Sequence, residues 1–141
     1  KRNMYWKKGE QNYAPVNVAS GIKAFGVLQM LLETQALDES KILIWDEPEN
    51  HLHPEWQIKF ASVLVELAKA GIPILISSHS PYFIQAVRYF ADKLSMNDFV
   101  NYYLAEETED ELCVLEDVTD DLNRIFMKLA QPMNEIVNLG L

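Results

Sequence analysis

Two adjacent carboxylates, Asp46 and Glu47, follow a run of four apolar residues and precede a proline. The run, residues 42–45, predicts a short strand buried on both faces, as in the centre of a parallel sheet. Ligand crevices in open α/β sheets lie beyond the carboxyl ends of the strands. Asp46 could therefore serve a magnesium ion there and Glu47 a water molecule. The dipeptide alone fits equally well with two acids that only cap the following loop.

A second apolar run, residues 72–77, ends in a Ser-Ser-His-Ser segment that contains His79. Between the two runs, residues 54–70 predict a helix with Phe60, Leu64 and Leu67 as its core stripe. Strand, helix and strand at this spacing form a βαβ unit, which requires a right-handed parallel crossover. We therefore expect residues 77–80 to lie beside Asp46 and Glu47.

The remaining elements complete an α/β fold. Residues 1–12 show no clear period, and residues 13–19 predict a short strand or an extended segment. A helix is expected at 22–36, capped by Ser20 and largely buried. Two more helices are expected at 81–94 and at 121–130, and Pro132 ends the second of these. Strands at 101–105 and 112–116 predict a hairpin. We expect one domain, residues 1–141, with a mainly parallel sheet flanked by helices and a C-terminal hairpin.

Composition limits the classes of function. The chain has 141 residues, and a hydrophobic content of 49% fits a globular domain. Its net charge of −9 argues against this portion supplying the main contact to nucleic acid. No apolar run reaches the length of a membrane span, and no signal segment opens the chain. The single cysteine, Cys113, excludes an internal disulfide, so a reducing cytoplasm is expected. Because Lys1 rather than Met comes first, we expect an excerpt from a longer protein.

Three segments in this order carry a family resemblance. Ile-Leu-Ile-Trp-Asp-Glu-Pro-Glu, then Asn-His-Leu-His-Pro, then Ile-Leu-Ile-Ser-Ser-His-Ser-Pro resemble the Walker B, D-loop and switch-histidine segments of ABC-type ATPases. Within these P-loop NTPases the chain looks most like the AAA/OLD-like branch, kin to RecF and SMC-type heads. Upstream, residues 18–23 stand where the family keeps its signature motif. The resemblance is close over residues 16–90 and implies the C-terminal lobe of an ATPase head.

The resemblance implies a separate role for each of three residues at the strand tips. Asp46 would hold the hydration shell of Mg²⁺, and Glu47 would polarise the attacking water. His79 would contact the γ-phosphate of ATP and the same water.

The resemblance also implies a homodimer that sandwiches ATP between two subunits. The helix N-terminus at Ser20 and Gly21 would contact the partner's nucleotide, since such a terminus carries about half a positive charge. Lys23 could add a cation there, although a solvated lysine is the commoner state of such a residue. Asn50 and His53 would lie along the same seam.

Two departures from the family pattern limit the resemblance. Ile22 and Lys23 replace the second glycine and the glutamine of the signature motif. In addition, the sequence contains no Gly-x-x-x-x-Gly-Lys-Ser/Thr phosphate loop. We therefore expect that loop in an N-terminal lobe outside this chain; without such a lobe this chain would not hold ATP and would be inactive.

The predicted function is ATP hydrolysis by a dimerising head, in DNA metabolism or phage defence, with DNA or an effector nuclease engaged by other parts of the parent protein. One alternative is a non-catalytic module for dimerisation or effector docking. Another is a metal-dependent nuclease built on Asp46, Glu47 and His79. A zinc site at Glu49, His51 and His53 is disfavoured, because a fourth ligand is lacking.

Overall fold

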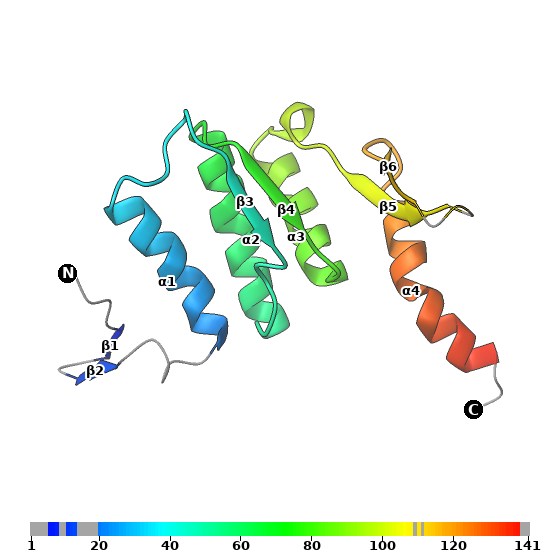
Figure 1. Cartoon of the computed structure of the whole chain (residues 1–141), viewed down its shortest axis with the longest axis horizontal. Coiled ribbons are helices and arrows are strands. Elements are labelled where there is room, and N and C mark those ends of the chain that lie inside the picture. Colours follow the sequence, from blue (N-terminus) through cyan, green and yellow to red (C-terminus); the bar gives the residue numbers. More distant parts are fainter. Residues whose placement is uncertain (1–5, 9–10, 14–19, 109, 111, 139–141) are drawn as a thin grey trace. The chain divides into compact units, whose positions relative to one another are not determined.

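The computed structural model describes residues 6–8, 11–13, 20–108, 110 and 112–138. The chain divides into two compact units, Lys1–Phe90 and Ala91–Leu141. The first unit contains the elements β1 (Trp6–Lys8), β2 (Gln11–Tyr13), α1 (Ser20–Glu33), β3 (Leu43–Asp46), α2 (Pro54–Lys69), β4 (Ile74–Ser77) and most of α3 (Pro81–Lys93) (Figure 1). It is an α/β arrangement in which helix and strand alternate from α1 onwards.

The predicted βαβ unit is confirmed. Strands β3 and β4 pair in parallel, with Leu43 opposite Ile74 and Asp46 opposite Ser77, and α2 connects them. Pro54 stands in the first turn of α2, where its missing N–H costs nothing. Gly71, which follows the helix, has a φ of 94°, a left-handed conformation that glycine adopts without strain.

The core of the first unit is built around Phe60 of α2, whose side chain is fully buried. Its ring lies 4.9 Å from that of Phe25 of α1, 5.7 Å from that of Trp45 of β3 and 6.4 Å from that of Phe83 of α3, between centroids. Leu64 is buried as predicted, whereas Leu67 of the predicted core stripe is only partly buried. One aromatic side chain thus joins four elements of the unit.

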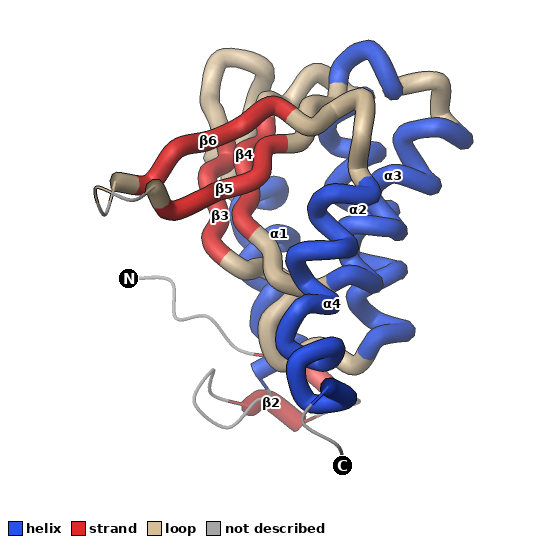
Figure 2. Tube along the Cα trace, turned by 90° about the vertical axis from the view of Figure 1, so that its right-hand side faces the viewer, coloured by secondary structure: helices blue, strands red, loops and turns tan. Residues whose placement is uncertain are grey.

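The prediction that the first strand is buried on both faces is wrong. Leu43 is buried, but Ile42, Ile44 and Leu75 are 57%, 68% and 55% exposed. Successive side chains of a strand point to opposite faces, and α2 and α3 both lie on the same face of the β3–β4 pair (Figures 1 and 2). Among the described elements of the first unit, none covers the opposite face. We call Ile42, Ile44 and Leu75 the bare face.

Several predicted boundaries also need correction. An antiparallel hairpin, β1–β2, occupies part of residues 1–12, where no regular structure was predicted; its three-residue strands are too short to show a period. Tyr13 ends β2, and residues 14–19 of the predicted strand lie outside the described part. Helix α1 begins at Ser20 rather than at residue 22 and ends at Glu33. It is also less buried than expected, because Met30 and Leu32 are exposed.

The second unit contains a 3₁₀ helix (Asn97–Phe99), β5 (Tyr103–Glu107), β6 (Cys113–Asp117) and α4 (Asn123–Asn138). The predicted hairpin is confirmed, since β5 and β6 pair antiparallel. The guanidinium of Arg124 in α4 donates to both carboxylate oxygens of Glu116 in β6, at 2.6 and 2.5 Å. This contact lowers the pKa of Glu116 and raises that of Arg124.

The prediction that Pro132 ends the last helix is wrong, because α4 continues through it to Asn138. A proline inside a helix removes one donor and crowds the preceding turn, at a cost of about 3 kcal/mol. Strong helix formers stand on both sides, among them Met127, Lys128, Leu129 and Gln131 before it. Their preference for the helix explains why the chain does not break there.

Candidate functional site

The carboxyl ends of β3 and β4 bring the predicted groups together. The hydroxyl of Ser77 donates to Asp46 Oδ1. The backbone N–H of Glu47 donates both to the carbonyl and to the hydroxyl oxygen of Ser77, at 3.2 Å each. The prediction that the Ser77–Ser80 segment lies beside Asp46 and Glu47 is therefore confirmed.

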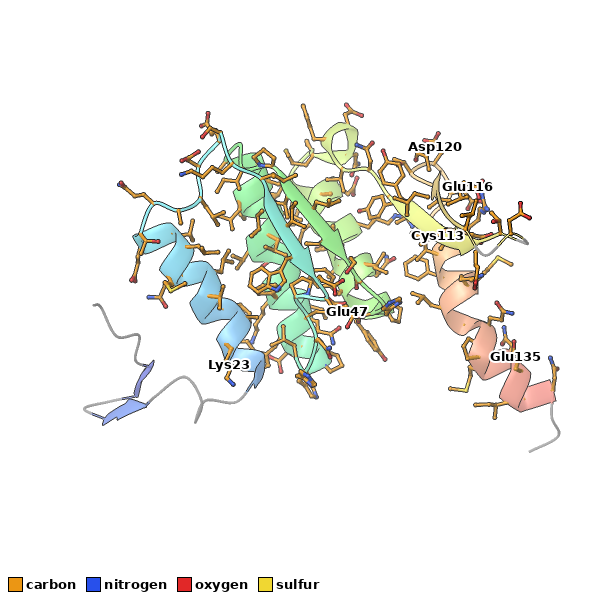
Figure 3. All side chains as sticks on the ribbon, in the orientation of Figure 1. Lys23, Glu47, Cys113, Glu116, Asp120 and Glu135 are labelled. Atoms are coloured by element: carbon orange, nitrogen blue, oxygen red, sulfur yellow. The ribbon has the colours of Figure 1, made fainter. Side chains whose placement is uncertain are left out.

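Glu47 stands beyond the end of β3 (Figure 3), between an imidazole and an amide. His79 Nε2 lies 3.4 Å from its Oε1, and Asn50 Nδ2 donates to its Oε2 at 3.2 Å. The backbone of Glu47 has a φ of 44°, in the left-handed region that costs an ordinary residue about 1–2 kcal/mol. Strain of this kind gathers at functional sites, where the surrounding structure holds it. The turn after β3 is thus built to present this carboxylate.

Three serines fasten the segment after β4 to the loop after β3 and to α2. Besides Ser77, Ser78 donates its hydroxyl proton to Glu49 Oε1. Ser80 Oγ donates to Gln57 Oε1 at 2.5 Å. His79 lies between the last two serines, so both of its neighbours are tied down. Sequence reasoning missed Glu49 and Gln57 as part of this site; serines on either side of a histidine were the only available signal.

An open hollow of about 170 Å³ lies beside these groups, although Asp46, Ser77 and Ser78 do not line it. Carboxylate, imidazole, amide and hydroxyl groups all reach it, so it can hold water and polar or charged ligand atoms. The residues that line it are Glu47, Glu49, Asn50, His51, Gln57, His79 and Ser80. All belong to the first unit.

The remaining predicted residues lie elsewhere in the unit. Ser20 and Gly21 form the first turn of α1; their side chains lie outside the described part. Lys23 is near the start of α1, apart from Glu47 (Figure 3). His53 is the N-cap of α2, and its Nδ1 accepts a hydrogen bond from the N–H of Glu55 at 3.3 Å. The roles given to these four residues toward a nucleotide stay predictions.

The donor set fits a cation that keeps most of its water. Asp46 presents an exposed carboxylate at the strand tip. Among the described residues, no three His, Cys, Asp or Glu side chains converge on a point where a metal ion could bind. Mg²⁺ is normally held by one or two carboxylates together with waters and substrate phosphates, so Asp46 suits it. The described residues therefore offer no converging set of ligands to support the zinc site or the nuclease alternative.

Comparison with known proteins gives the family. Residues 4–85 match the family described as "AAA domain, putative AbiEii toxin, Type IV TA system". This match covers more than half of the chain, and the chain belongs to this AAA domain family.

Two relatives are each similar to somewhat more than half of the chain. An uncharacterized protein of Methanocaldococcus jannaschii is 30% identical over 88 residues, which are 62% of this chain and 10% of that protein. The energy-coupling factor transporter ATP-binding protein EcfA of Methanothermobacter thermautotrophicus is 29% identical over 86 residues, 61% of this chain and 25% of that protein. The similarity thus spans a quarter or less of each relative's length.

None of the described helices combines the length and the apolar character needed to cross a bilayer.

Proposed function

We propose that this chain forms part of an ATP-hydrolysing head of the ABC type, in the AAA/OLD-like branch. The observation that carries the proposal is the contact of Glu47 with His79 and Asn50 at the tips of two parallel strands. Membership of an AAA family and similarity to a transporter ATP-binding protein support it. In this proposal, the chain supplies the signature, Walker B, D-loop and switch-histidine segments.

Each residue at the strand tips has one task in the proposed reaction. Glu47 accepts a proton from the attacking water, a contribution of about 10²–10⁴ in rate. Asn50 orients its carboxylate through Oε2, which leaves Oε1 for the water and for His79. Asp46 holds the hydrated Mg²⁺. When bound, Mg²⁺ neutralises charge on the transferring phosphoryl group.

We further propose that the phosphate loop belongs to a separate N-terminal lobe, which packs on the bare face. All-parallel sheets occur almost only with both faces covered. This rule calls for a further layer over Ile42, Ile44 and Leu75, which are more than half exposed. The lengths of the relatives, of which the matched residues are 10% and 25%, leave room for such a lobe.

A second candidate function is a non-catalytic module for dimerisation or effector docking. The bare face favours it as well, because an apolar face can bind a partner without any chemistry at the strand tips. For either candidate function, we propose that the parent protein acts in DNA metabolism, or in phage defence together with an effector nuclease.

Phosphate release from magnesium-ATP distinguishes the two. The protein used should contain this segment together with a phosphate loop. Sustained release that depends on Mg²⁺ is expected if the head hydrolyses ATP. Dimerisation without any release above the blank would overturn hydrolysis and favour the docking module.

The proposed dimer makes a separate prediction about Ser20. If the N-terminus of α1 reaches the partner's nucleotide, Ser20→Arg places bulk and a misplaced cation in the partner's site. A second variant lacks the lysine of the phosphate loop. In a mixed dimer with one lesion on each subunit, both faults fall on one composite site, and the other site is intact. Mixing the two inactive proteins should therefore restore part of the phosphate release, up to about half if the sites act independently.

The control for this experiment is a mass measurement that demonstrates heterodimers in the mixture. Absence of recovery with heterodimers present would count against independent sites shared between subunits. If Ser20 acted only on the nucleotide of its own subunit, each subunit of the mixed dimer would carry one damaged site, and no activity would return.

A further inference from the structure

We propose that Glu49 is a positioning residue, which acts through Ser78 to hold His79 against Glu47. This inference rests on the proposed ATPase function and deepens it. It assigns a role to a side chain that has no task in the proposed reaction.

The first observation concerns how His79 is held. Its side chain is 81% exposed, yet its Nε2 lies 3.4 Å from Glu47 Oε1. An exposed imidazole is not fixed by packing, so the backbone on either side must fix it. Ser78 provides that support, because its Oγ donates to Glu49 Oε1 and accepts from the N–H of Ser80 at 3.1 Å. One hydroxyl thus links both neighbours of His79 to Glu49.

The second observation concerns the cost of Glu49 itself. The residue is only 4% exposed, and within the described part its Oε2 is buried without a hydrogen-bond partner. A buried acceptor left unsatisfied costs about 1–3 kcal/mol, more if charged, and buried charges are weak contributors to stability. A carboxylate nevertheless gives the strongest acceptor for a hydroxyl, roughly twice as strong as a neutral one. Burial of this carboxylate therefore adds little to stability, whereas its hydrogen bond with Ser78 anchors the His79 segment.

The position of Glu49 in the chain strengthens this interpretation. It lies two residues after Glu47, in the loop that also supplies Asn50 to Glu47. The base and the anchor of its imidazole partner therefore move together as one loop. Any shift that separated Glu49 from Ser78 would change the distance between Glu47 and His79.

The test uses the complete protein, with this segment and a phosphate loop, and compares three substitutions at two positions. Glu49→Ala and Ser78→Ala each remove one end of the link, and each should lower kcat by about 10- to 100-fold, since a displacement of 1 Å can cost about 10²-fold. KM for ATP should change by less than about 2-fold, because neither residue is assigned a contact to nucleotide. Glu49→Gln keeps an acceptor oxygen in the same place and should retain kcat within about 3-fold of the unsubstituted protein, because a hydroxyl can still donate to it.

A double-mutant cycle separates positioning from a general structural role. In a His79→Ala background, Glu49→Ala should cause no further loss of kcat, because its effect passes through the imidazole. Glu66→Ala is the matched control, since Glu66 is an exposed glutamate of α2 outside the hollow, and it should leave kcat and the melting temperature unchanged. Should Glu49→Ala prevent folding, Ser78→Ala removes a single hydroxyl and carries the same cycle.

Three outcomes would overturn the inference. One is an additive further loss in the His79→Ala background. Another is an equal loss of kcat in Glu49→Gln and Glu49→Ala. The third is unchanged kcat in Glu49→Ala and Ser78→Ala, while Glu47→Gln abolishes turnover; the proposed function would then stand and this inference alone would fail. If the unsubstituted protein releases no phosphate, the proposed function fails and the inference fails with it.

Discussion

Replacing Glu47 by glutamine is expected to lower ATP turnover by about 10²–10⁴-fold, the usual contribution of a positioned general base. The amide keeps the shape of the side chain but does not accept a proton from water. Binding of ATP should persist, because Glu47 is assigned no contact that holds the nucleotide, and the ATP-bound dimer should accumulate. Single-turnover phosphate release and size measurements with ATP present follow both effects.

The structure indicates that Glu47→Gln changes the proton acceptor and leaves the backbone and the hydrogen bond from Asn50 in place. Glu47 has a φ of 44°, and glutamine tolerates that conformation no worse than glutamate, so the backbone strain is unchanged. Asn50 Nδ2, now 3.2 Å from Oε2, can still donate to the amide oxygen. Glu66→Gln, the same change on the exposed face of α2, serves as the control. Turnover near the parent rate in Glu47→Gln would show that another group is the base.

Replacing Asp46 by asparagine should produce a different defect. A neutral amide oxygen is a poorer ligand for Mg²⁺, which prefers carboxylate oxygens. A metal ion contributes several kcal/mol to stabilising the transition state, so kcat should fall by about 10²-fold or more. The Mg²⁺ concentration that gives half of the maximal rate should rise at the same time. Titration of phosphate release with MgCl₂ measures both quantities.

The control for Asp46→Asn is Asp38→Asn, in the loop before β3. Hydrogen bonds from Lys41 and Ser40 hold the pKa of Asp38 at about 2, so this substitution also removes a charged carboxylate at neutral pH. Asp38 precedes β3, whereas Asp46 is the last residue of that strand, so replacement of Asp38 should leave the magnesium titration unchanged. If Asp46→Asn hydrolysed ATP with the parent's magnesium dependence, the metal would have to be held elsewhere.

The local sequence was sufficient to predict the framework of the site. Residues 42–45 and 72–77 are apolar runs separated by one helical segment, and parallel crossovers have a fixed hand. Those two facts alone place residues 77–80 beside Asp46 and Glu47, and the parallel pairing of β3 with β4 confirms this. The hairpin of β5 and β6 was predictable for a similar reason, since its strands are close in sequence and are joined by a short turn.

The contacts that adjust the site were decided only by the tertiary structure. Whether Glu49 is buried, and whether it meets Ser78, depends on how two loops 29 residues apart fold onto each other, and no local pattern encodes that. The left-handed backbone of Glu47 is likewise imposed by its surroundings, because an isolated glutamate avoids that conformation.

The exposure of the bare face also depends on the tertiary structure and not on the local sequence. The run of residues 42–45 is apolar throughout, which predicts a strand covered on both faces, and the residues themselves are suited to that environment. Ile44 is nevertheless 68% exposed, because α2 and α3 pack on the same face of the β3–β4 pair. The sequence indicates which faces of a strand are apolar. Which of these faces is covered depends on how the helices pack on the sheet.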